Sequence, residues 1–168
     1  MTENLFLLIT KDLIFYGYVI IIFSIYGFQS SISQTAYELR KTKDYWIFCL
    51  VTLSYATLGF IIYPSLVTGL MSVGLYFAAA APWFRDNSTQ TITHYFGANL
   101  AMAGGFYLIF WEFGFYTLGY FMAITLLLLE YIPGFFRGLK IENKTTWIEI
   151  IIYTFISFSY YLNYFLWK

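Results

Sequence analysis

The sequence predicts an all-α membrane protein, a polytopic transmembrane bundle of about six helices. Three observations lead to this prediction: 60% of the 168 residues are hydrophobic, only 11% are charged, and long runs of sequence are apolar on every face. Soluble domains carry about 25% charged residues, so this chain has too few charges to cover a soluble surface. Runs such as VIIIFSIYGF also lack the alternating polarity of a membrane β-barrel. Helices remain, because they satisfy their own backbone hydrogen bonds in lipid.

Individual spans follow from the length that a bilayer requires, which is about 20 apolar residues per helix. Cutting the chain at charges, prolines and polar clusters predicts a single transmembrane domain, residues 1–168, with spans at 13–31, 45–63, 66–83, 93–112, 115–133 and 147–167. Tight hairpins are expected at Pro64 and at residues 112–114, where Glu112 is interpreted as a polar tip. The three other connections are longer and polar: 33–44, 85–91 and 137–145.

The basic residues predict the orientation of the bundle, because cytoplasmic loops retain Lys and Arg. With six spans, Lys11 and Lys168 are expected on one side. The long connections on the other side hold Arg40, Lys41, Lys43, Arg85, Arg137, Lys140 and Lys144. This distribution of seven against two predicts that both termini face outward, N-out and C-out, with the long connections in the cytoplasm.

Small residues predict how two of the helices pack. Helices in lipid associate where small side chains let their backbones approach. The fourth span carries Gly97, Ala101 and Gly105 at intervals of four, which places all three on one helical face. The third span offers Gly74 and Ala78. We expect these two faces to pack together; the alternative is that they form a contact between copies of the chain.

A group of polar residues predicts a candidate site at the cytoplasmic ends of the helices, since ionisable groups within spans are costly and often functional. One hypothesis is a cytoplasm-facing pocket that binds a cation, a proton or a small ligand. The alternative is that these charges lie at the membrane surface and pair with nearby Arg or Lys. The candidates are His94, Glu130 and Glu149 at one expected depth, with Arg85 and Asp86 beside them and Asn99 deeper.

Composition and motifs argue against several other classes of function. A net charge of zero provides no field for nucleic acid. A metal site would depend mainly on a few carboxylates, because the chain has one cysteine, Cys49, and one histidine, His94. HExxH, GxSxG and glycine-rich phosphate-loop motifs are absent from the sequence. The sequence therefore predicts no enzyme, no metal and no cofactor.

Two segments resemble a known family. Residues 31–39 (SISQTAYEL) and 79–105, with Trp147 and Glu149, resemble small multi-pass membrane proteins of Bacteroidota and of their phages and prophages. The segment HYFGA, 94–98, is also similar to an element of the Frag1/DRAM-like membrane proteins. The first resemblance implies a bacterial inner membrane and carries no activity. It directs attention to residues that we expect at the cytoplasmic ends of three spans: Ser31, Ser33, Thr35, Tyr37, Pro82, Asp86 and His94.

These observations together predict an integral inner-membrane protein that is a channel, a pore-like effector or a small transporter. The cytoplasm-facing polar pocket would be its binding or gating site, and the bundle is expected to form a homo-oligomer. One alternative is a membrane scaffold or phage accessory protein that acts by binding another membrane protein. An intramembrane enzyme is the third interpretation. All three interpretations start from the same apolar runs, so the lipid bilayer is the expected environment in each of them.

Overall fold

A computed structural model shows that the chain folds into a helical bundle. The structure describes residues 2–27, 31–32, 35–36, 39, 43–83, 87–131 and 144–166. These residues form α-helices and contain no strand, so the predicted all-α class is confirmed. The α-helices are α1 (Thr2–Tyr26), α3 (Trp46–Ile62), α4 (Leu66–Ala80), α5 (Asn87–Tyr107), α6 (Tyr116–Tyr131) and α7 (Lys144–Leu166). A short 3-10 helix, η1 (Ala81–Trp83), follows α4, and a π-helical turn, η2 (Leu108–Glu112), follows α5.

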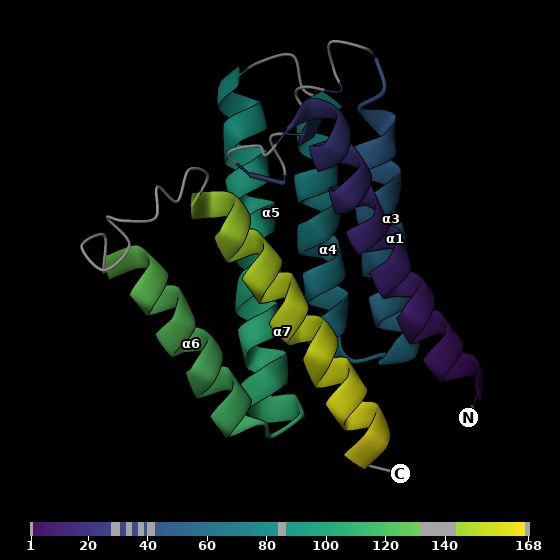
Figure 1. Cartoon of the computed structure of the whole chain (residues 1–168), viewed down its shortest axis with the longest axis vertical. Helices are drawn as coiled ribbons and strands as arrows, with labels where there is room; N and C mark the ends of the chain where they lie inside the picture. Colours follow the sequence, from purple (N-terminus) through teal and green to yellow (C-terminus); the bar gives the residue numbers. More distant parts are fainter. Residues whose placement is uncertain are drawn as a thin grey trace.

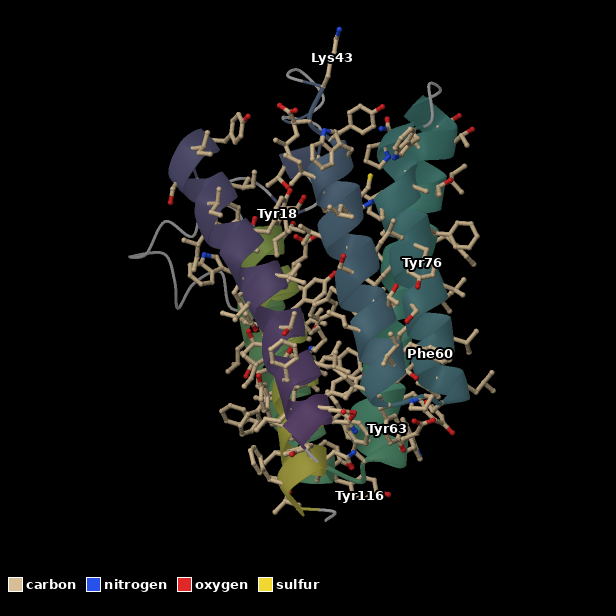
Figure 2. All side chains as sticks on the ribbon, turned by 90° about the vertical axis from the view of Figure 1, so that its right-hand side faces the viewer. Tyr18, Lys43, Phe60, Tyr63, Tyr76 and Tyr116 are labelled. Carbon is tan, nitrogen blue, oxygen red and sulfur yellow. The ribbon has the colours of Figure 1, made fainter. Side chains whose placement is uncertain are left out.

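Successive helices run in alternating directions, and both chain termini lie at the same end of the bundle (Figure 1). We call this end the terminal end and the opposite end the loop end. The short connections 63–65 and 113–115 also lie at the terminal end (Figure 1). Figure 2 shows Tyr63 and Tyr116 near the terminal end and Lys43 at the loop end. Both tight hairpins therefore lie at the end that carries the termini.

Three segments are long and apolar enough to cross a membrane: Glu3–Tyr26, Tyr45–Ile62 and Leu66–Trp83. The segment Tyr116–Leu128 is apolar but shorter. Large hydrophobic side chains on the outside of the bundle are widely exposed, for example Leu66, which is 80% exposed. Apolar surface of this extent is suited to lipid rather than to water. The chain is therefore an integral membrane protein.

The first helix differs from the expected span of 13–31, because α1 covers Thr2–Tyr26. Lys11 was expected outside the first span, whereas the helix continues through Lys11 and Asp12. It ends before Gly27, whose φ of +75° is a left-handed conformation that glycine adopts without strain. The fourth helix also begins earlier than expected, at Asn87 instead of residue 93, and the last begins at Lys144 instead of residue 147.

The closest helix pair is α4 with α5, and its contact passes through glycines. A Cβ atom on Gly74 would lie 2.7 Å from both the Ala101 amide nitrogen and the Gly97 carbonyl oxygen. A Cβ atom on Gly97 would lie 2.6 Å from the Ala78 amide nitrogen. Gly105 lies closer to α7, since its Cβ atom would lie 2.5 Å from Ile156 Cδ1 of α7 and 3.8 Å from Met71 Cε of α4. Helix α5 is therefore held between α4 and α7, and the small residues of α4 and α5 lie against each other.

Replacing Gly74 with alanine is predicted to destabilise the bundle. The added methyl group meets backbone atoms, which cannot rotate away, so overpacking should cost about 1 to 3 kcal/mol. Gly17→Ala in α1 is the matched control, because nothing lies within 4 Å of its Cβ position and alanine favours the helix. Thermal unfolding in detergent measures both variants. Equal stability of Gly74→Ala and the parent would show that α4 and α5 are farther apart.

Candidate functional site

Lys11 is the most unusual side chain in the bundle, because it is fully buried. Its exposed fraction is 0%, and it is the largest side chain that is completely enclosed among the described residues. Lys11 is the tenth residue of α1, which places it about 14 Å along the axis from the start of the helix. A charge at such a position is costly unless it is paired and hydrogen-bonded.

The Lys11 ammonium donates hydrogen bonds to two other helices and forms an ion pair within α1. Lys11 Nζ donates to Ser157 Oγ of α7 at 2.9 Å and to the Tyr55 hydroxyl of α3 at 3.2 Å. The same nitrogen lies 2.9 Å from Asp12 Oδ1. An ammonium group has three N–H donors and no acceptor. These three oxygens therefore match its full donor capacity.

Two aromatic rings complete the surroundings of the ammonium. Lys11 Nζ lies 4.3 Å from the centroid of the Tyr55 ring and 5.2 Å from that of Tyr160. A cation within about 6 Å of a ring face is attracted by the negative charge of the π-system. Phe15, one turn after Lys11 in α1, packs against Tyr55 with ring centroids 5.2 Å apart. Aromatic residues of α1, α3 and α7 thus enclose the charge.

Asp12 connects the lysine to α7. Ser157 Oγ donates a hydrogen bond to Asp12 Oδ1 at 2.8 Å, and Tyr161 also hydrogen-bonds this carboxylate. The Asp12 side chain is 14% exposed, whereas Lys11 is completely covered. Neighbouring residues of a helix point in different directions. Lys11 therefore faces the interior of the bundle while Asp12 lies against the flank of α7.

A small cavity adjoins Lys11. It lies between α1, α3, α4 and α7, and its volume of about 20 Å³ is room for about one water molecule. Lys11, Tyr55 and Tyr160 line one part of it, and Thr68 and Ser72 of α4 line another. The cavity therefore places hydroxyl groups of α4 opposite the buried ammonium.

The candidates predicted from sequence have separate partners in the structure. The half-buried His94 ring hydrogen-bonds the backbone of Ala78. Glu149 instead accepts a hydrogen bond from the Ile32 amide. Asn99 lies on an exposed position of α5. Arg85, Asp86 and the Glu130 side chain lie outside the described residues. The shared cytoplasmic pocket therefore stays a prediction.

Sequence reasoning missed the Lys11 site, because Lys11 was expected outside the first span. The correction is that Lys11 lies inside α1 and is buried by side chains of α3 and α7. A sequence signal was present: apolar residues 5–9 precede the pair and 13–15 follow it. Two adjacent residues of opposite charge, within an apolar run long enough to span a membrane, can form a buried ion pair. They do not always mark the end of a helix. The partners Tyr55 and Ser157 are too distant in sequence to be predicted locally.

Comparisons of the chain with protein-family models, with curated proteins and with solved structures found no match. Within the described residues, no group of three or more His, Cys, Asp and Glu side chains is placed to hold a metal ion. The Lys11–Asp12 pair and its cavity are the strongest basis for a functional proposal, because they combine buried charge with space inside the bundle.

Asp12→Asn is predicted to destabilise the protein by about 3 kcal/mol, because it leaves a buried ammonium without its counter-charge. Lys11→Met should cost less, since Asp12 is partly exposed. The double variant should be more stable than the sum of the two single effects predicts. Lys43→Met and Asp44→Asn are the matched control, because the same dipeptide occurs there with Lys43 exposed. Unfolding in detergent measures the stability of each single and double variant. If the losses of stability at positions 11 and 12 simply add, Lys11 and Asp12 do not form the pair.

Proposed function

We propose that this protein is a small transporter of the bacterial inner membrane that moves protons, with the Lys11–Asp12 pair as its proton-binding site. The observation that carries the proposal is the complete burial of Lys11 inside the first membrane-crossing helix. Ionisable side chains inside membrane helices are costly and commonly mark pathways for ions or protons. The proposal moves the site from the cytoplasmic ends of the helices into the bundle.

The size and chemistry of the cavity support a proton as the transported species. Room for about one water molecule excludes an organic solute from the site in this conformation. The groups around the pair can each donate and accept a hydrogen bond: Tyr55, Thr68, Ser72 and Ser157 are hydroxyl side chains. Such a set of hydroxyls with one water can pass a proton along hydrogen bonds.

The proposed orientation places the loop end in the cytoplasm, with six helices crossing the membrane and both termini outside. The basic residues support it, because Lys43 and the start of α7 at Lys144 lie at the loop end. Burial of Lys11 removes one of the two basic residues that were expected outside, which leaves Lys168. With the other basic residues at their expected positions, the distribution becomes seven against one, which favours the same orientation.

The scaffold and enzyme interpretations, and assembly into a homo-oligomer, stay predictions. No contact among the described residues favours any of these over a proton pathway. The small residues of α4 and α5 that could have joined two copies contact each other within one chain. A second copy would therefore have to use a different surface.

Proton flux into liposomes tests the proposed function. The parent protein should acidify the vesicle interior when a potassium diffusion potential drives protons inward. Lys11→Arg should reduce the rate at least about tenfold, because a guanidinium keeps the charge but does not release its proton. Lys43→Arg is the control and should match the parent. Parental flux in Lys11→Arg would contradict the assigned site.

Cysteine labelling tests the proposed orientation in a Cys49→Ala background. Lys43 at the loop end and Tyr116 at the terminal end are both exposed. In intact cells, a membrane-impermeant maleimide should react with Tyr116→Cys and leave Lys43→Cys unlabelled until the membrane is opened. The reverse pattern would place the loop end outside the cell.

A further inference from the structure

Glu112 is a second ionisable group whose surroundings differ from the expected polar tip of a hairpin. It is the last residue of the π-helical turn η2, at the terminal end of the bundle. Its side chain is partly covered, and the Oε2 atom is buried with no hydrogen-bond partner among the described residues. The π-helical turn is closed by hydrogen bonds from the Phe113 amide to the Leu108 carbonyl and from the Phe115 amide to the Ile109 carbonyl.

An unpartnered carboxylate oxygen in a covered position is costly, because the charge loses its hydration and gains no donor in return. A bound proton removes the charge and converts the oxygen into a hydrogen-bond donor. Exposure of the rest of the side chain leaves Glu112 within reach of water at the terminal end. The Glu112 carboxyl group is thus covered at one oxygen while its side chain is partly open to the terminal end.

The neighbours of Glu112 come from two other parts of the bundle. Tyr63 of the α3–α4 turn and Tyr160 of α7 both lie within electrostatic range of its carboxylate. The Phe113 ring packs edge-on against each of these tyrosines, with centroids 4.8 Å from Tyr63 and 5.6 Å from Tyr160. Phe113, the residue after Glu112, therefore packs between Tyr63 and Tyr160 at the terminal end.

This meeting point is connected to the buried lysine through Tyr160 and Thr68. Tyr160 lines the cavity beside Lys11, and it lies one helical turn after Ser157, the hydrogen-bond partner of Lys11. Thr68 lines the same cavity, and its Oγ1 donates to the Tyr63 carbonyl oxygen at 2.6 Å. The cavity is thus bounded by residues that contact Lys11 on one side and the Tyr63 turn on the other.

We propose that Glu112 is the group through which the Lys11–Asp12 site exchanges protons with the compartment at the terminal end. This inference rests on the proposed function. In the inward step, the Glu112 carboxylate binds a proton from external water and becomes the neutral acid. Its O–H bond then breaks as the proton passes through water in the cavity to Tyr55, and along the Tyr55 and Ser157 hydroxyls to the Asp12 carboxylate. Glu112 returns to the carboxylate and Asp12 becomes the acid, so one proton moves and no electron is transferred.

Among the residues that the structure describes, the titratable groups beside the two stations are tyrosines. Those around the Lys11–Asp12 pair are Tyr16 of α1, Tyr55 of α3, and Tyr160 and Tyr161 of α7. Helix α4 contributes the hydroxyl groups of Thr68 and Ser72. The Tyr160 ring lies 5.2 Å from Lys11 Nζ and 5.6 Å from the Phe113 ring, so it lies between the two stations. Exchange of protons between the stations would couple Glu112 to the charge at Lys11.

Proton flux in liposomes and infrared titration test the proposal together. Glu112→Gln should reduce flux at least about tenfold, and Glu112→Asp should restore part of it. Glu3→Gln, an exposed residue at the same end, is the control and should match the parent. In infrared spectra recorded across a pH titration, the parent should show the carbonyl stretch of a protonated carboxylic acid that Glu112→Gln lacks. Lys11→Met should shift the pH at which this band appears.

The outcomes separate the two proposals. Parental flux in Glu112→Gln, combined with loss of flux in Lys11→Arg, would overturn the role of Glu112 and support the Lys11 site. No flux in the parent would overturn both. An infrared band that is lost in Glu112→Gln but unmoved by Lys11→Met would also overturn the inference, because the two groups would then not share protons.

Discussion

The physical constraint on which this structure depends is the cost of a charge inside a low-dielectric bundle. Lys11 can remain in the first helix only if α3 and α7 supply oxygens at hydrogen-bonding distance, and Tyr55 and Ser157 do so. These contacts set the register of α1 against both helices. A buried ion pair is seldom the most stabilising choice, because apolar side chains of the same volume often serve as well. The proposed proton transport would give a lysine at this position a role that an apolar side chain could not fill.

Close packing of α4 and α5 supports the site indirectly. The backbones meet at Gly74 and Gly97, which holds one face of α4 close to α5. The α3-facing side of α4 then carries Ser72, whose hydroxyl donates to the Ala56 carbonyl at 2.9 Å and lines the cavity. The capping box of Ser65 and Thr68 begins the same helix and positions Thr68 at the other side of the cavity. One glycine contact therefore helps to place two of the hydroxyls beside the lysine.

Sequence reasoning predicted the fold class because composition and the length of apolar runs depend on the solvent, and lipid imposes both. The hairpin turns at Pro64 and Gly114 were also predictable, since proline interrupts a helix and Gly114 adopts a φ of +67°. The site was not, because charge alone does not distinguish a helix end from a buried pair. Expected depth alone could not decide whether His94 and Glu149 are neighbours, because the rotation of each helix about its axis depends on packing. The buried oxygen of Glu112 likewise depends on the π-helical turn, which local sequence does not reveal.

The central claim is that the Lys11 ammonium lies among aromatic rings inside the bundle and not in water. Solid-state NMR of the protein in lipid bilayers, with nitrogen-labelled lysine and carbon-labelled tyrosine, tests this claim most directly. The account predicts one lysine side-chain signal that is lost in Lys11→Met and shows close contacts to tyrosine ring carbons, as expected from the 4.3 Å between Lys11 Nζ and the Tyr55 ring centroid. A Lys11 signal that lacks tyrosine contacts and exchanges with bulk water as the exposed Lys43 does would contradict it.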